Sequence, residues 1–182
     1  MTWRETELPG AFVVESERME DERGWFARVY DEGELEQRGL ATRFPQGSIA
    51  FNKEQGTLRG LHYQAEPHAE AKLVRCIRGA VHDVIVDLRP ASPTFKRWVA
   101  VELTAASGRT LYVPEGLAHG YLTLEDESET LYLISAPYAP EAARGVRWDD
   151  PAFAIPWPFR PTVISPRDAT FPDFDPGYHL PA

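Results

Sequence analysis

The sequence predicts an all-β protein, either a sandwich or a barrel, and two observations support this prediction. Short runs rich in β-branched and aromatic residues recur at regular spacing through residues 10–138, with turn residues between them. From residue 151 onward, prolines are so frequent that neither a long helix nor a central strand fits. Because 182 residues suffice for a core and no repeat or low-complexity linker interrupts them, we expect one domain over 1–182.

The individual elements follow from local patterns. Residues 32–39 predict a short helix, since good helix formers there end at Gly39. Residues 71–90 predict two strands around a turn at Arg78-Gly79, and alternation in the second strand places His82 among apolar side chains. The other strand candidates are residues 10–17, 24–31, 96–104, 108–116, 120–126 and 129–138.

The proline-rich C-terminal segment is expected to be an ordered coil with one or two short turns that wraps the barrel. Aromatic side chains would anchor it to the rest of the domain; the candidates are Trp148, Phe153, Trp157, Phe159 and Phe171.

Composition limits the classes of function. A formal net charge of −9 argues against a general nucleic-acid surface, although a local basic pocket for a small phosphate ligand stays compatible with it. Cys76 is the single cysteine, so no internal disulfide is possible and a reducing compartment fits. No signal peptide and no apolar run approaching ~18 residues is visible, so we expect a cytoplasmic protein without a membrane span.

Residues 58–74, LRGLHYQAEPHAEAKLV, concentrate chemically active side chains in a strand-rich chain: Arg59, His62, His68 and Lys72. Such a concentration indicates a binding or catalytic site. The structural alternative for His62 is a barrel-lining imidazole bonded to a backbone carbonyl. We expect the remaining imidazoles to be structural or on the surface: His68, His82 and His179.

Residues 108–119 read G-x5-P-x-G-x2-H, which resembles the second signature of the cupin superfamily. That likeness implies a jelly roll, or double-stranded β-helix, in which His119 begins a strand and points into the barrel mouth. Metal-binding cupins carry H-x-H in their first signature, where this chain has His62-Tyr63-Gln64. Lys72 is expected on a neighbouring inward face, and an ammonium disfavours a nearby divalent cation. We therefore expect no metal; a metal-dependent cupin is a distant alternative.

Seven motifs in order resemble the dTDP-4-dehydrorhamnose 3,5-epimerase family, between about Asp21 and Asp168: RGLHYQ, AKLVR, GAVHDVIVDLRPASPTF, VPEGLAHGY, LYLISAPYAPE, RGVRWDDPAFAIPWP and ISPRD. The resemblance implies a jelly-roll homodimer without metal or cofactor. It also implies epimerisation at the carbons that flank the C4 ketone of a nucleotide-linked 4-keto-6-deoxyhexose.

The resemblance implies four catalytic residues. His62 matches the base, a role that suits histidine near neutral pH. Asp168 matches its carboxylate partner, and Lys72 matches the group beside the C4 oxygen, where a cation stabilises an enolate. Tyr132 matches the proton donor on the far face of the sugar. Without the motifs, Tyr132 would equally suit a strand core.

The resemblance also implies substrate-binding residues. Arg59 and His119 would line the sugar and phosphate site, and Tyr138 would stack in the nucleotide region. Arg167 would lie near the diphosphate. Arg23 and Phe26 would reach a nucleotide across the dimer.

The chain departs from the family pattern at four recognition positions. Arg28 and Ala143 stand where the family tends to have Glu, and Gly47 and Ile49 where it tends to have Gln-x-Asn. The proton-transfer groups are kept, so the departures leave open the sugar, the nucleobase and the number of inverted carbons. The alternatives are an epimerase acting at C3 or C5 only, on a modified or CDP-linked sugar, and a non-catalytic cupin that binds a sugar nucleotide.

Overall fold

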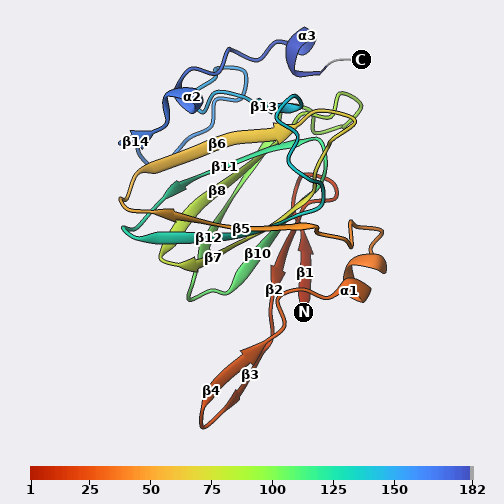
Figure 1. The fold of residues 1–182 in the computed structure, drawn as a ribbon, viewed down its shortest axis with the longest axis vertical. Coiled ribbons are helices and arrows are strands. Elements are labelled where there is room, and N and C mark those ends of the chain that lie inside the picture. The colour runs from red at the N-terminus through yellow and green to blue at the C-terminus, as the bar shows by residue number, and fades with distance from the viewer. Residues whose placement is uncertain (181–182) are drawn as a thin grey trace.

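A computed structural model describes residues 1–180, in which two antiparallel sheets pack face to face (Figure 1). The first sheet contains, in spatial order, β1 (Thr2–Glu5), β2 (Phe12–Glu15), β10 (Arg109–Val113), β7 (Lys72–Arg78), β12 (Ser128–Ile134) and β5 (Gln46–Asn52). The second contains β13 (Ala143–Gly145), β6 (Thr57–Gln64), β11 (Leu117–Thr123), β8 (Ala80–Asp87) and β9 (Trp98–Thr104), with β14 (Val163–Ile164) running parallel to β6. The predicted all-β class is confirmed.

The β7–β8 hairpin follows the predicted pattern closely. Gly79, at φ 72°, makes the turn between the two strands. Alternate residues of β8 bury on opposite faces: Val81 and Ile85 face the interior of the sandwich, while Val84 and Val86 face the C-terminal segment. Both faces of this strand are covered, which explains its nearly continuous apolar run.

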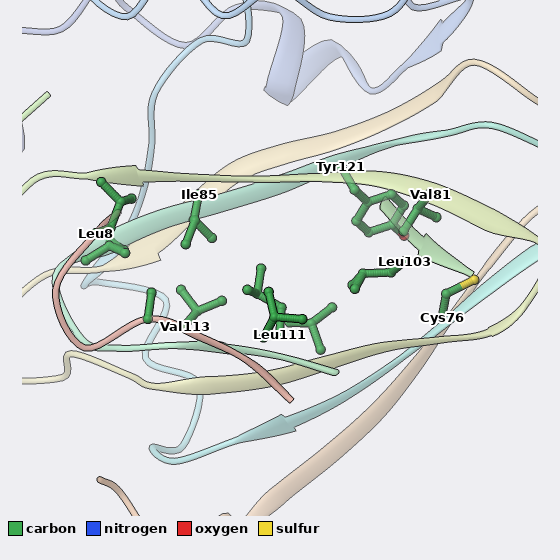
Figure 2. Close-up of a cluster of buried hydrophobic side chains, with 12 residues drawn as sticks. Leu8, Cys76, Val81, Ile85, Leu103, Leu111, Val113 and Tyr121 are labelled. Carbon is green, nitrogen blue, oxygen red and sulfur yellow. The ribbon is translucent and has the colours of Figure 1, made fainter. Parts of the chain in front are cut away.

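The main hydrophobic core fills the space between the two sheets. Figure 2 shows its members converging from both sheets and, for Leu8, from the loop between β1 and β2: Leu8, Cys76, Val81, Ile85, Leu103, Leu111, Val113 and Tyr121. Tyr121 belongs to this core and also lines the cavity described below. The core therefore supports one wall of that cavity with rigidly packed side chains.

The C-terminal segment wraps the outer face of the second sheet, as predicted (Figure 1). It includes two short helices, α2 (Pro166–Ala169) and α3 (Pro176–His179). Phe153 and Trp157 anchor it against the sheet, whereas Phe159 is more than a third exposed and does not. Trp148 contributes through its carbonyl, which accepts the indole N–H of Trp157. This bond joins two residues of the segment to each other, while the packing of Trp157 attaches the segment to the sheet.

The N-terminal third differs most from the prediction. The predicted helix is α1 (Glu32–Glu36), capped by the Asp31 side chain. The predicted strand at 24–31 shortens to β4 (Gly24–Ala27), which pairs only with β3 (Arg18–Asp21) in a hairpin that protrudes from the body (Figure 1). No helix within residues 1–180 is long and apolar enough to cross a membrane.

Candidate active site

A cavity of about 650 Å³ opens between the two sheets. Strands β5, β6, β7, β11 and β12 wall it, and α2 closes one side. Eight residues singled out in the sequence line it together: Arg59, His62, Lys72, His119, Tyr132, Tyr138, Arg167 and Asp168. The volume suits a ligand larger than a single sugar ring.

His62 and Asp168 form a hydrogen-bonded pair at this cavity. His62 Nε2 lies 2.8 Å from Asp168 Oδ1, and Gly60 N–H donates to Oδ2 at 3.1 Å. Burial acts to raise the pKa of Asp168, but the bonds from His62, Gly60 and Ser165 outweigh it and lower that pKa. A carboxylate accepts, so the imidazole carries its proton on Nε2 and leaves Nδ1 free to act as a base.

The RGLH stretch reaches this position because of a close backbone approach between β6 and β11. A Cβ at Gly60 would lie 2.5 Å from the Cα of Gly120, and Gly60 has φ 128°, so glycine is required there. Behind the imidazole, the Phe171 ring packs edge-on against His62 with centroids 5.9 Å apart. The sequence prediction used Phe171 only as an anchor, but it also fixes the orientation of the base.

Lys72 enters the cavity from β7 with a carboxylate partner. Its Nζ lies 2.9 Å from Glu70 Oε1 and 3.4 Å from the carbonyl oxygen of His62. Both side chains of the ion pair are about nine-tenths buried. Glu70 lies just before β7, which begins at Lys72, and both side chains line the cavity. The ammonium is held beside the base, where it can donate to an oxygen on a bound ligand.

His119 is paired as well. Its Nε2 lies 3.0 Å from both carboxylate oxygens of Asp83, and neither side chain is more than 4% exposed. It is the third residue of β11 rather than the first residue of a strand, as the motif had suggested. A second imidazole is therefore held rigidly in the cavity wall.

Tyr132 faces the cavity from the sheet opposite His62. Its ring lies edge-on to that of His119, with centroids 6.0 Å apart. Burial, together with Tyr121 and Asp83, raises the pKa of Tyr132 well above its ordinary value. The phenol is therefore protonated at neutral pH and available as a proton donor.

The cavity rim carries guanidinium groups. Arg59 donates to Asn52 Oδ1 at 2.7 Å, and the Arg167 guanidinium lies over the Phe171 ring, 5.8 Å from its centroid. Within residues 1–180, neither forms an ion pair with a carboxylate. Arg144 also lines the cavity, and its buried Nε has no partner in the same residues. Unpaired guanidinium groups favour an anionic ligand.

Two predicted binding residues lie outside this cavity. Arg23 and Phe26 sit on the protruding β3–β4 hairpin, where Arg23 pairs with Asp21 and Phe26 is 62% exposed. Arg28 is also remote and pairs with Asp31 at 3.4 Å. One chain alone thus does not bring them to the site.

The predicted recognition positions in β5 were out of register by one residue. Gly47 and Ile49 point away from the cavity, and Ile49 is 62% exposed. The side chains that line the cavity from this strand are Gln46, Ser48 and Ala50. Alternation in a strand explains the correction, since a shift of one residue exchanges its two faces. Ala143, by contrast, does line the cavity.

Asp83 and Glu70 were missed as site residues. Asp83 could have been found from strand alternation. Asp83 shares a face with Val81 and Ile85, where a buried carboxylate needs a partner. Glu70 lies two residues before β7, outside any strand, so alternation gives no signal for it. Gln64, at the position of a metal-binding histidine in other cupins, instead binds backbone groups of His68, Pro137 and Ala139.

The other histidines lie as expected. His82 packs against the Trp157 ring, and burial lowers the pKa of its imidazole. His179 is buried with Nε2 near the carbonyl of Gly145, and His68 is partly exposed near Glu141. The described residues contain no cluster of three or more His, Cys, Asp or Glu side chains arranged to hold a metal ion.

Comparison with known proteins identifies the family of the chain. The family model described as dTDP-4-dehydrorhamnose 3,5-epimerase matches residues 5–176. Relatives of that name include one from Sinorhizobium fredii, 42% identical over 88% of this chain and 83% of its own length. Another, from Shigella flexneri, is 42% identical over 90% of each chain.

Solved structures match equally well. The Bacillus anthracis dTDP-4-dehydrorhamnose 3,5-epimerase with TDP and PPi bound is 39% identical, with a TM-score of 0.91 over 95% of this chain and 99% of its own. ChmJ, a 3'-monoepimerase from Streptomyces bikiniensis in complex with dTDP-quinovose, is 34% identical, with a TM-score of 0.86 over 92% of this chain and 85% of its own. The matched length and identity show that the chain belongs to the dTDP-4-dehydrorhamnose 3,5-epimerase family.

Proposed function

We propose that this protein inverts C3 and C5 of a dTDP-4-keto-6-deoxyhexose in the biosynthesis of a rhamnose-type deoxysugar. One observation carries the proposal: a histidine–carboxylate pair and a protonated phenol face one cavity from opposite sheets. Inversion needs a base on one face of a carbon and a proton donor on the other. A protein that only binds a sugar nucleotide has no need of this pair.

In the first step, His62 Nδ1 takes the proton from the carbon next to the ketone. The electrons of the C–H bond move into the C4 carbonyl and form an enolate. Asp168 stabilises the imidazolium through the 2.8 Å bond at Nε2. Lys72 donates to the enolate oxygen, which gains negative charge in this step.

In the second step, Tyr132 gives its phenolic proton to the opposite face of the same carbon. The enolate electrons form the new C–H bond, and the C4 ketone returns. The tyrosinate takes a proton from water, and His62 releases one to water, which restores both groups. The same cycle at the second carbon completes the 3,5-epimerisation.

The rim suits the rest of the substrate. Arg59 and Arg167 bind the diphosphate, His119 lines the sugar site, and Tyr138, which is 58% exposed, stacks on the nucleobase. Ligand-bound structures of relatives support a dTDP-sugar ligand. A Legionella pneumophila relative, 35% identical, holds dTDP-4-keto-L-rhamnose.

We also propose a two-fold homodimer in which each hairpin completes the partner's cavity. The hairpin exposes large apolar side chains far from its own cavity: Met19, Trp25 and Phe26. Such exposed groups mark an interaction surface. Arg23 and Phe26 would then reach the nucleotide bound in the other subunit. We expect the enzyme to work in the cytoplasm, without a metal or cofactor and without a nucleic-acid partner.

A second function, inversion at C3 alone, is favoured by the likeness to the 3'-monoepimerase ChmJ. Proton NMR of dTDP-4-keto-6-deoxyglucose in D2O with this protein separates the two. Deuterium at both C3 and C5, with new product signals, supports the 3,5-epimerase. Deuterium at one carbon supports the restricted enzyme. No exchange with folded protein, using the dTDP-linked and the CDP-linked sugar, would refute both.

A further inference from the structure

A buried row of polar side chains connects the cavity wall to Tyr132. Arg59 Nε donates to Asn52 Oδ1 at 2.7 Å. The Tyr121 hydroxyl lies 3.2 Å from Asn52 Nδ2 and 3.3 Å from its Oδ1. The Thr130 hydroxyl lies between two phenols, 3.1 Å from the oxygen of Tyr121 and 3.2 Å from that of Tyr132.

This row is sealed from solvent. Asn52, Tyr121 and Thr130 are 2%, 1% and 0% exposed. Hydroxyl and amide groups so deeply buried are costly unless they are hydrogen-bonded, and each of these is. Thr130 and Tyr132 stand two residues apart on β12, so strand geometry directs both side chains to the same side.

The protons of the row can be counted. The Thr130 hydroxyl has one proton to donate, either to Tyr121 or to Tyr132. Within residues 1–180, no carbonyl or carboxylate accepts the proton of Tyr132. That proton is therefore free to point into the cavity when Thr130 donates to the Tyr132 oxygen. The bond from Thr130 also lowers the pKa of Tyr132, against the larger effect of burial, which raises it.

We propose that Thr130 is a positioning residue for inversion, an inference that rests on the proposed role of Tyr132 as proton donor. Its hydroxyl donates to the Tyr132 oxygen and keeps the phenolic proton directed at the substrate. When Tyr132 protonates the carbon, its oxygen keeps the electron pair of the broken O–H bond. The Thr130 hydroxyl then donates to a phenolate, and hydrogen bonds to charged acceptors are roughly twice as strong as neutral ones.

The role of Thr130 is confined to the second step. Removal of the substrate proton by His62 takes place at the opposite sheet and does not involve Tyr132. Loss of the Thr130 hydroxyl should thus slow inversion without slowing the exchange of substrate protons with solvent. A threonine that only stabilised the fold would not separate these two rates.

The test compares Thr130→Val with Thr130→Ser in D2O, with inversion and deuterium exchange into recovered substrate measured in one NMR time course. Thr130→Val should lower the ratio of inversion to exchange by roughly ten- to a hundredfold, as expected for a lost bond to a charged group. Thr130→Ser keeps the hydroxyl and should rescue the ratio. Thr110→Val is the matched control, because Thr110 is also buried but its hydroxyl has no partner within residues 1–180.

The outcomes separate the inference from the function on which it rests. If the wild type neither exchanges nor inverts, the proposed function fails and the inference falls with it. If the wild type is active and Thr130→Val keeps its ratio, or the serine variant is equally impaired, the inference alone is wrong. If Thr130→Val does not fold, Tyr121→Phe removes the competing acceptor of the Thr130 proton, so that Thr130 donates to Tyr132 alone and the ratio should rise; an unchanged or lowered ratio would overturn the inference.

Discussion

Asp168→Asn tests the His62–Asp168 pair with almost no change in side-chain shape. The carboxylate accepts from His62 Nε2 at 2.8 Å and from Gly60 N–H at 3.1 Å. Asparagine has one oxygen for these two donors. If its NH2 group turns to the imidazole, His62 must carry its proton on Nδ1, the nitrogen that should act as base. If its oxygen turns there instead, the Gly60 N–H loses its acceptor.

Both arrangements also remove the negative charge that stabilises the imidazolium. We therefore expect kcat to fall by about 10²–10⁴, the range seen when a general base or its orienting carboxylate is disabled. KM should change little, because the amide stays outside the diphosphate and base contacts. The assay is the rate of deuterium incorporation into saturating dTDP-4-keto-6-deoxyglucose in D2O.

Asp173→Asn is the control, since Asp173 lies in the same C-terminal segment and pairs with Arg147 at the surface. It should retain wild-type rates. An Asp168→Asn enzyme that exchanges as fast as this control would refute the assignment of His62 and Asp168 as the base pair.

Lys72→Met should lower kcat by about 10²–10³, as for loss of an oxyanion donor, and an unchanged kcat in steady-state kinetics would remove Lys72 from the reaction. Mixing and refolding inactive His62→Ala with inactive Phe26→Ala chains should restore activity, because a mixed dimer contains one complete site; no recovery would contradict the shared site. Burial raises the pKa of Cys76 to about 11, so native protein at pH 8 should resist an aromatic disulfide reagent until it is unfolded, and rapid native labelling would contradict its burial.

Strand alternation and turn residues carried most of the fold prediction. The β7–β8 hairpin was predictable because Gly79 interrupts a long apolar run whose two halves alternate. Six strands were not among those predicted: β1, β3, β5, β6, β13 and β14. Of these, β13 and β14 have only three and two residues and leave no periodic signal. The C-terminal wrap was predicted from proline content and aromatic anchors, although Phe159 turned out to be exposed.

The site was predicted unevenly, for a physical reason. His62 and Lys72 lie in one short stretch of sequence. Glu70, the partner of Lys72, lies in the same stretch, whereas Asp168, the partner of His62, lies far along the chain. Asp168 is more than a hundred residues from His62, so only the motif resemblance connected them. Hydrogen-bonded rows such as Tyr121–Thr130–Tyr132 combine side chains from both sheets, and no pattern along a single strand predicts them.

Register was the weakest part of the prediction. The recognition positions in β5 were assigned to Gly47 and Ile49, whereas Gln46 and Ser48 face the cavity. That assignment came from the motif match alone, because residues 46–52 were not predicted as a strand, and an offset of one residue exchanges the two faces of a strand. The β3–β4 hairpin presents a related limit, because a single chain does not reveal what its exposed aromatic side chains contact.

The central claim is that two groups act on opposite faces of one carbon. It is tested most directly by the isotope content of product formed by the wild-type enzyme in D2O at early conversion. If His62 removes the proton and Tyr132 supplies another, every inverted carbon carries deuterium, while unreacted substrate carries little. Product that retains the original protium at an inverted carbon would mean that a single group removes and returns the proton, and would contradict the two-sided mechanism.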